Sequence, residues 1–251
     1  MIEIIRLIKT LHGGGHKVEI LKSLDLAIPS GQFIAITGHS GSGKTTLLSL
    51  IAGLDTPTSG TINIDGQDIT KLNEDELALL RGKRFGFIFQ NFHLIPTLTA
   101  VENVVLSAEL NNTPGATKKS EDLLGMVGLG DRMQHYPAQL SGGEQQRLSL
   151  ARAFINEPDI ILADEPVASL DPAAADRVMQ TLERINNEDG STVLVSLHQI
   201  EYALKYCGRI IALKDGKLIF DGTASETTPE FFTELYGRSI DGDEDHQIEH
   251  V

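Results

Sequence analysis

The chain has 251 residues, of which 41% are apolar, which is enough for one compact domain with small lobes. Its apolar runs are strand-sized, far short of the roughly 20 residues that cross a bilayer. Because Glu3, Arg6 and Lys9 interrupt any signal-peptide core, we expect a protein that stays in the cytoplasm. A net charge of −14 without a dense run of Lys and Arg argues against binding to nucleic acid or to an anionic membrane surface.

The first seventy or so residues contain hairpin-like material. Gly13, Gly14 and Gly15 predict a flexible hairpin tip. Alternating residues at 61–66, which end in Asp-Gly, predict a strand that enters a turn. Between these segments, the apolar residues 33–37 predict a strand, and 47–51 predict a helix.

A glycine-rich run between that strand and that helix has the composition of a phosphate-binding loop. Successive glycines let backbone N–H groups turn inward around an anion, and the positive end of the helix dipole adds to the attraction. In this pattern Lys44 reaches the β- and γ-phosphates, and the Thr45 hydroxyl is a ligand of Mg²⁺. The predicted nucleotide-binding residues of the loop are Gly38, His39, Ser40, Gly41, Ser42, Gly43, Lys44, Thr45 and Thr46.

An alternating pattern of strands and helices runs through the rest of the chain. The short apolar segments 85–89, 160–163, 192–196 and 209–213 join 33–37 in predicting a parallel sheet that is covered on both faces. Phosphate chemistry then belongs at the carboxyl ends of these strands. Between about 91 and 156 the pattern turns helical, with helices predicted at 100–110, 117–127 and 144–155.

Two adjacent carboxylates follow one of these strands. Asp164 ends the strand, where it suits the hydration shell of Mg²⁺, and Glu165 can orient or deprotonate an attacking water. Pro166 stops strand pairing directly after them, which leaves both side chains at the edge of the sheet. His198 follows the next strand, where its imidazole can contact the γ-phosphate.

The segment 140–147, Leu-Ser-Gly-Gly-Glu-Gln-Gln-Arg, opens the predicted helix 144–155. The hydroxyl of Ser141 and the backbone N–H groups of Ser141, Gly142 and Gly143 form an anion site at the start of that helix. No nucleotide of the same subunit fills this site, so we expect it to serve the ATP of another subunit.

This octapeptide resembles the signature of ABC transporter ATPases, and the other motifs of that family stand in order around it. Gln90 is similar to the family's Q-loop glutamine, Asp171 to its D-loop aspartate, and His198 to its switch histidine. The resemblance covers essentially the whole chain. It implies an α/β fold of the P-loop NTPase class, with a RecA-like parallel sheet core, an N-terminal antiparallel β subdomain and an inserted helical subdomain at about 91–156. Residues 1–240 then form a single ATPase domain, and the acidic residues 241–251 are predicted to be a disordered tail.

The resemblance also implies a mechanism. Two cassettes, in a homodimer or a pseudo-dimer, face each other head to tail. ATP and Mg²⁺ lie between the phosphate loop of one cassette and residues 141–143 of the other, and Asp171 reaches across the interface. Lys44, Gln90, Glu165 and His198 carry catalysis, and Gln90 senses Mg²⁺ and the attacking water. The implied partners are integral membrane permease subunits on the cytoplasmic face of a membrane, with no nucleic acid.

One position departs from the family. Many relatives stack an aromatic side chain on adenine, but the corresponding position holds Leu11, followed by His12. The contact with adenine is therefore expected to be apolar or imidazole-based, and the selectivity for the base stays open.

The cargo also stays open. Segments before about Ala151, such as 52–60 and 85–96, resemble lipoprotein-releasing and macrolide-exporting ATPases, whereas 167–172 and 197–207 resemble phosphonate importers. The chain thus resembles a mosaic, natural or engineered. The first resemblance implies a lipoprotein or hydrophobic compound as cargo, and the second implies a phosphonate-type oxyanion. Two alternatives are a cassette that signals mechanically to a membrane complex and a soluble relative without a transport role.

Overall fold

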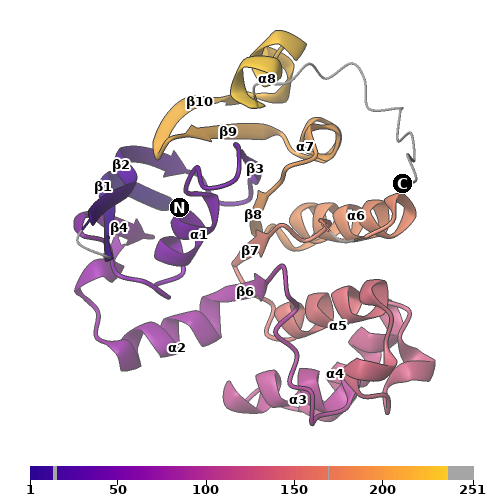
Figure 1. Cartoon of the computed structure of the whole chain (residues 1–251). Helices are drawn as coiled ribbons and strands as arrows, with labels where there is room; N and C mark the ends of the chain where they lie inside the picture. The colour runs from indigo at the N-terminus through magenta and orange to yellow at the C-terminus, as the bar shows by residue number, and fades with distance from the viewer. Residues whose placement is uncertain (14–15, 169, 237–251) are drawn as a thin grey trace.

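Figure 1 shows the computed structural model of the chain, which describes residues 1–13, 16–168 and 170–236. Gly14 and Gly15 of the predicted hairpin tip, Ser169, and the predicted acidic tail, 241–251, lie outside the described residues. Within these ranges, none of the helices is long and apolar enough to cross a membrane.

The core is a six-stranded sheet in which all five predicted strands lie side by side. The strand order is β10-β9-β3-β8-β7-β6, and every neighbouring pair is parallel except β9 and β10. Its strands are β3 (Phe33–Thr37), β6 (Phe85–Ile88), β7 (Ile160–Asp164), β8 (Thr192–Ser196), β9 (Arg209–Lys214) and β10 (Lys217–Thr223). The predicted α/β fold with a parallel core is confirmed.

A second, antiparallel sheet of four strands, in the order β2-β1-β4-β5, comes from the first part of the chain. Its strands are β1 (Ile2–Gly13), β2 (His16–Ile28), β4 (Ser59–Ile64) and β5 (Gln67–Asp68). The strand predicted at 61–66 ends at Ile64, because Asp65 and Gly66 take positive φ angles of 48° and 84° and form the turn into β5. The predicted N-terminal antiparallel part is thus confirmed.

Eight α-helices complete the described fold: α1 (Lys44–Ile51), α2 (Glu74–Arg84), α3 (Ala100–Leu110), α4 (Ala116–Met126), α5 (Gly142–Phe154), α6 (Pro172–Asp189), α7 (Ile200–Tyr206) and α8 (Pro229–Tyr236). The helices predicted at 100–110 and 117–127 correspond to α3 and α4, the second displaced by one residue. α5 begins two residues before its predicted start, because Ser141 and Glu144 form a capping box that starts the helix at Gly142.

Both faces of the parallel sheet are buried, as the apolar strands predict. Ile34 and Ile36 of β3 face a core that is shared with α1 and the antiparallel sheet. Phe33 and Ala35, on the other face, pack in a core that is shared with α5, α6, α7 and α8. Side chains alternate between faces with a period of two along a strand, so each strand contributes to both cores.

Helices α3, α4 and α5 lie together at one end of the molecule and have an apolar core of their own. Val104 of α3, Leu124 of α4 and Leu148 of α5 are fully buried in it. A capping box of Thr99 and Glu102 fixes the start of α3. We call these three helices the helical lobe.

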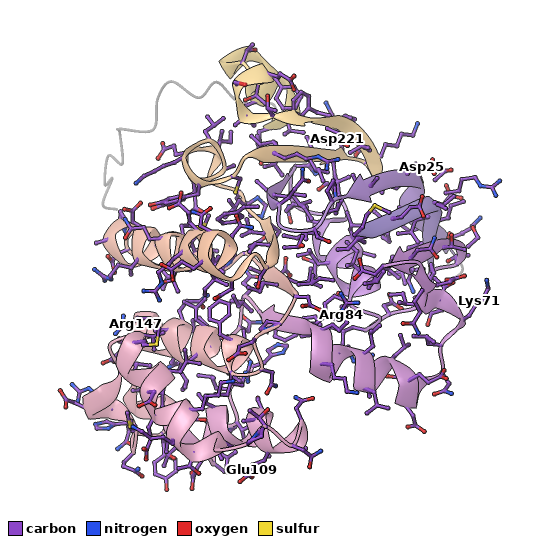
Figure 2. The ribbon with its side chains drawn as sticks, turned by 180° about the vertical axis from the view of Figure 1, so that it is seen from behind. Asp25, Lys71, Arg84, Glu109, Arg147 and Asp221 are labelled. Atoms are coloured by element: carbon purple, nitrogen blue, oxygen red, sulfur yellow. The ribbon has the colours of Figure 1, made fainter. Side chains whose placement is uncertain are left out.

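Helix α2 has no buried residue, and its start and end are fixed by polar contacts instead. Asn73 and Glu76 form a capping box at its first turn. At its last residue Arg84 donates to Asp65 (2.5 Å) in the turn of the antiparallel sheet and to Asp159 (2.7 Å) before β7, at the junction seen in Figure 2. Arg84 thus ties the antiparallel sheet to the parallel core.

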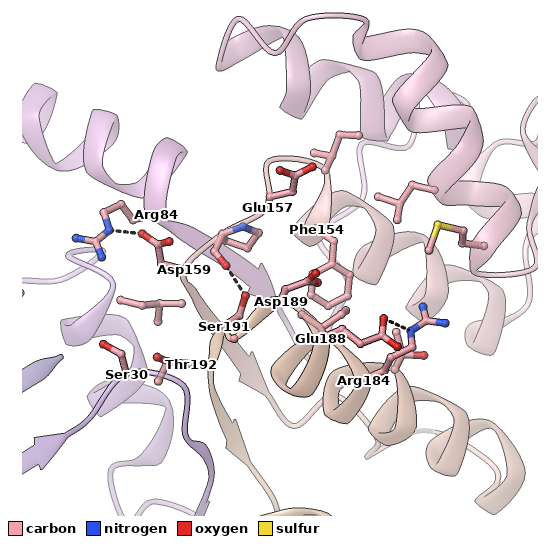
Figure 3. Close-up of a pocket in the computed structure, with 18 of the residues that line it drawn as sticks. Ser30, Arg84, Phe154, Glu157, Asp159, Arg184, Glu188, Asp189, Ser191 and Thr192 are labelled. Atoms are coloured by element: carbon pink, nitrogen blue, oxygen red, sulfur yellow. Dashed lines mark hydrogen bonds and ion pairs between the residues drawn. The ribbon is translucent and has the colours of Figure 1, made fainter.

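A cavity of about 670 Å³ lies at the amino ends of β7 and β8, between the helical lobe and α6 (Figure 3). Most of its charged lining residues form ion pairs with one another: Arg84 with Asp159, Lys119 with Glu157, and Arg184 with Glu188 at 4.0 Å. None of the predicted phosphate-loop residues lines it. The predicted site residues lie away from this cavity, at the carboxyl ends of the strands and thus at the opposite edge of the sheet.

Candidate active site

The predicted phosphate loop connects β3 to α1, and two of its glycines leave no room for a side chain. Gly38 has a φ of 143°, and a Cβ added to it would lie 2.2 Å from the carbonyl oxygen of Leu213. Gly43 has a φ of 105°, and its Cβ would lie 2.7 Å from Cδ2 of Leu21. Only glycine fits both the angle and the space at these positions, so the loop follows one tightly defined path.

The first turn of α1 presents its backbone N–H groups without a side-chain cap. Its N-cap, Gly43, has a left-handed conformation and no capping side chain. Side chains of Asn73, Thr99, Ser141 and Asp171 cap α2, α3, α5 and α6, respectively, with hydrogen bonds. Helix α4 also begins at a left-handed glycine without a capping side chain, but only α1 follows the glycine-rich loop. The uncapped N–H groups of α1 and the positive end of its dipole therefore fit the anion site that the sequence predicts.

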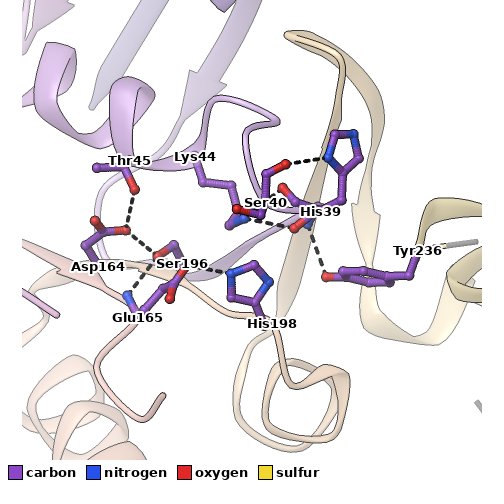
Figure 4. A network of polar contacts seen from close by, with 10 residues as sticks. His39, Ser40, Lys44, Thr45, Asp164, Glu165, Ser196, His198 and Tyr236 are labelled. Carbon is purple, nitrogen blue, oxygen red and sulfur yellow. Dashed lines mark hydrogen bonds and ion pairs between the residues drawn. The ribbon is translucent and has the colours of Figure 1, made fainter. Parts of the chain in front are cut away.

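Lys44 lies in the middle of the loop, with 4% of its surface exposed. Its ammonium Nζ donates to the carbonyl oxygens of Gly38 (2.8 Å) and His39 (3.2 Å), as Figure 4 shows. Burial lowers the pKa of Lys44, while the charges of Glu165 and Asp164 act in the opposite direction. The ammonium is thus poised between loop carbonyls and carboxylates, where an incoming phosphate can replace its carbonyl partners.

Thr45 and Asp164 meet at the carboxyl end of β7. The Thr45 hydroxyl donates to Oδ1 of Asp164 at 3.1 Å, and the Ser196 hydroxyl donates to the same oxygen at 2.6 Å. Among the described residues, no group of three or more His, Cys, Asp or Glu side chains is placed to hold a metal. One hydroxyl and one carboxylate nevertheless fit Mg²⁺, because this ion takes few protein ligands and fills its octahedron with water and phosphate oxygens.

Glu165 and His198 form a direct pair. Nε2 of His198 lies 2.5 Å from Oε1 of Glu165, whose side chain is 16% exposed. Glu165 has a φ of 48°, a left-handed conformation that non-glycine residues seldom adopt. Such a strained conformation persists only where surrounding contacts hold it. Here the conformation directs the carboxylate of Glu165 toward the phosphate loop.

Ser196 holds the strained backbone, and sequence reasoning gave it no role. Its hydroxyl accepts the backbone N–H of Glu165 at 2.8 Å while it donates to Asp164. The strand β8 places Ser196 directly beside Asp164 in the register of the sheet. A hydroxyl residue at the end of an otherwise almost wholly apolar strand is the sequence feature that points to this position.

Other predicted site residues lie outside this cluster. Gln90 follows β6, the strand next to β7, and its side chain is exposed. Ser141 caps α5 and donates its hydroxyl to Glu144 at 2.9 Å, while Asp171 caps α6 by accepting the N–H of Ala174 at 3.0 Å. The structure thus brings together Lys44, Thr45, Asp164, Glu165 and His198. Within the described part of the chain, no hydrogen bond joins Gln90, Ser141, Gly142, Gly143 or Asp171 to this cluster.

The position expected near adenine lies on β1. Leu11 is 52% exposed there, and the side chain of His12 is not among those described.

Comparisons with known proteins identify the family of the chain. The sequence model of the family described as ABC transporter matches residues 21–168. The macrolide export ATP-binding/permease protein MacB of Brucella abortus (strain 2308) is 46% identical over 233 residues, which are 92% of this chain and 36% of that protein. The chain therefore spans about a third of the length of this relative.

Two other relatives are covered more fully. The uncharacterized ABC transporter ATP-binding protein YbbA of Escherichia coli (strain K12) is 43% identical over 220 residues, 87% of this chain and 96% of that protein. The methionine import ATP-binding protein MetN 2 of Enterococcus faecalis (strain ATCC 700802 / V583) is 40% identical over 251 residues, 99% of this chain and 72% of that protein. The predicted resemblance to macrolide exporters is confirmed, and that to phosphonate importers stays a prediction.

A solved structure has the same fold. It is a dimeric post-hydrolysis state of the ATP-binding cassette MJ0796 bound to ADP and Pi, with a TM-score of 0.85 and 41% identity, covering 89% of this chain and 99% of that one. The uncapped helix of the phosphate loop, the paired carboxylates beside it and these matches lead to one conclusion: the chain belongs to the ABC transporter family and is one of its ATP-hydrolysing cassettes.

Proposed function

We propose that the chain is the ATPase subunit of a transporter, binding ATP and Mg²⁺ at residues 38–46 and using hydrolysis to drive partner membrane subunits. The observation that carries this proposal is the uncapped start of α1, with the buried Lys44 beside Asp164 and Glu165. An anion site, a cation and a carboxylate pair at one edge of a parallel sheet are the parts that phosphoryl transfer requires.

Each residue of the cluster has a role in this proposal. Lys44 binds oxygens of the β- and γ-phosphates, for which it gives up the carbonyls of Gly38 and His39. Thr45 and Asp164 hold Mg²⁺, with Gln90 as a further ligand contributed from the end of β6. When bound, Mg²⁺ neutralises charge on the phosphate oxygens.

Glu165 is the general base. Water attacks the γ-phosphorus, its proton passes to the carboxylate of Glu165, and the bond between the γ-phosphorus and the bridging oxygen breaks to leave ADP and phosphate. His198, 2.5 Å from Glu165, orients the carboxylate and contacts the γ-phosphate. Ser196 supports this geometry, because it ties the backbone of Glu165 to the side chain of Asp164.

A second cassette completes the site. Ser141, Gly142 and Gly143 lie at the start of α5, close to the start of α6, where a Cβ on Gly143 would lie 3.8 Å from Cβ of Ala174. This places the signature residues and Asp171 at neighbouring helix starts, apart from the phosphate loop of their own chain. The proposed function is therefore that of a head-to-tail dimer in which these residues contact the partner's ATP. The dimeric state of the related cassette favours this arrangement.

The membrane partner belongs to the same proposal. Residues 1–240 act as one ATPase domain whose helical part, about 91–156, contacts permease subunits at the cytoplasmic face of a membrane, without nucleic acid. For the cargo we favour export or release of a hydrophobic compound or lipoprotein, supported by the similarity to a macrolide exporter. Import is the second candidate, supported by the similarity to a methionine import protein along almost the whole chain. Co-purification of the permease distinguishes them, because the partner fixes the direction of transport.

Hydrolysis of ATP by the purified chain, with Mg²⁺, tests the site. Lys44→Ala is expected to lose ATP binding and hydrolysis, because it removes the cation at the centre of the loop. Lys118→Ala is the matched control, since Lys118 is an exposed lysine on α4 that pairs with Asp122. If Lys44→Ala binds and hydrolyses ATP as well as the control does, the site is assigned wrongly.

A further inference from the structure

The first turn of the phosphate loop is bound by the far end of the described chain. The phenol oxygen of Tyr236, the last residue of α8, accepts the backbone N–H of Gly38 at 3.1 Å (Figure 4). Gly38 is buried, so this N–H depends on Tyr236 as its acceptor in the absence of water. Residue 236 lies outside the range 21–168 that the family's sequence model matches.

Apolar packing fixes the position of Tyr236. Phe232 and Leu235 of α8 are 2% and 3% exposed in the core of the parallel sheet. The ring of Phe231 lies 4.9 Å from that of Phe220 on β10. Burial raises the pKa of Tyr236, while the hydrogen bond from Gly38 lowers it, so the phenol is neutral at physiological pH and its oxygen is free to accept.

Two more contacts to this turn come from the same part of the chain. The carbonyl oxygen of Leu213, at the end of β9, lies so close to Gly38 that a Cβ would be 2.2 Å away. In the turn between β9 and β10, Oδ1 of Asp215 lies 3.5 Å from Nε2 of His39. Residues 213–236 thus hold Gly38 and His39, whose carbonyls are the two partners of the Lys44 ammonium.

We propose that Tyr236 is a positioning residue for the phosphate loop, acting through the Gly38 peptide on Lys44. The N–H of Gly38 is held by Tyr236, and its carbonyl by Lys44, so both ends of this glycine are fixed. Gly38 has a φ of 143° and no side chain, so its conformation depends on the contacts of its own peptide groups. A loop held in one conformation loses less entropy when phosphate binds, and it binds phosphate more tightly.

Tyr236→Phe tests this inference, which rests on the nucleotide site proposed above. The variant removes one oxygen and keeps the ring that packs in the core. We expect the Kd of ATP, measured by calorimetry with Mg²⁺, to rise about tenfold, a loss of about 1.4 kcal/mol. The KM should rise with it, while kcat at saturating ATP stays within about twofold, because Glu165 and His198 keep their contact. Tyr136→Phe makes the same chemical change at an exposed residue between α4 and α5, and its Kd should match that of the unaltered chain.

A second probe, which lacks adenosine, separates binding of the phosphates by the loop from binding of adenine. Inorganic tripolyphosphate should lose affinity for Tyr236→Phe by the same factor as ATP, because Tyr236 acts on the loop that binds phosphates. An unchanged Kd for both probes, with or without a lower Tm, would show that α8 only supports the fold and would overturn the inference. A loss confined to ATP would overturn it as well. If the unaltered chain itself bound neither probe, the nucleotide site would be refuted, which is a different result.

Discussion

Replacing Ser196 by alanine tests how the carboxylates are held. The substitution removes the oxygen that accepts the N–H of Glu165 and donates to Asp164 (2.8 and 2.6 Å). Ser196 is fully buried, so the backbone N–H of Glu165 is left with no side-chain acceptor and with little access to water. An unsatisfied buried donor costs roughly 1–3 kcal/mol, and a hydrogen bond to a charged group contributes about 1.5–3 kcal/mol.

These contributions overlap, so we expect Ser196→Ala to lower the free energy of unfolding by about 2–4 kcal/mol. Turnover should fall by about 10- to 100-fold, which corresponds to about 1.4–2.7 kcal/mol in the barrier, because the strained Glu165 is free to relax. Denaturant unfolding and steady-state ATP hydrolysis measure the two effects.

The chain supplies a matched control in Ser149. Its side chain is also fully buried, on α5, but its hydroxyl has no hydrogen-bond partner among the described residues. Ser149→Ala should therefore leave stability equal or slightly higher and leave turnover unchanged. If Ser196→Ala behaves as Ser149→Ala does, the bridge between Glu165 and Asp164 contributes neither to folding nor to catalysis, and the reasoning is refuted.

Three other predictions concern the dimer, the adenine contact and the single cysteine. Ser141→Arg should abolish ATP-driven dimerisation in light scattering while a single subunit still binds ATP, and dimers that form and hydrolyse ATP normally would contradict the head-to-tail arrangement. With Leu11 in place of an aromatic, affinities for ATP and GTP should differ by less than about tenfold. Leu11→Tyr should tighten ATP binding through stacking of about 1–3 kcal/mol. A strong native preference for ATP that His12→Ala removes would show instead that His12 contacts adenine. Because burial raises the pKa of the Cys207 thiol, it should resist a thiol reagent until the chain unfolds, and rapid labelling of the native protein would show that α7 opens.

The sequence was sufficient to predict the parts of the fold that are buried on both faces. β3, β7 and β8 are short apolar runs typical of strands inside a parallel sheet, and the loop after β3 needs glycine at both Gly38 and Gly43. Helix α2 was missed because none of its residues is fully buried: only Leu77 and Leu80 pack partly against the core, and its capping box and Arg84 fix its two ends.

Contacts between distant residues could not be predicted from the sequence. The role of Ser196 depends on its register opposite Asp164, which only the pairing of β7 with β8 determines. Tyr236 lies 198 residues from Gly38 along the chain, and nothing in a local pattern joins them. Ser141 and Asp171 cap α5 and α6 within their own chain, whereas the partner proposed for them belongs to another subunit.

The most direct test of the account is Glu165→Gln, which keeps the size of the side chain and removes the base. Lys44 and the uncapped start of α1 are untouched, so ATP should bind as before, turnover should fall by about 10² or more, and an ATP-bound dimer should accumulate in gel filtration. Hydrolysis close to that of the unaltered chain, with no accumulated dimer, would contradict the assignment of Glu165 and with it the proposed mechanism.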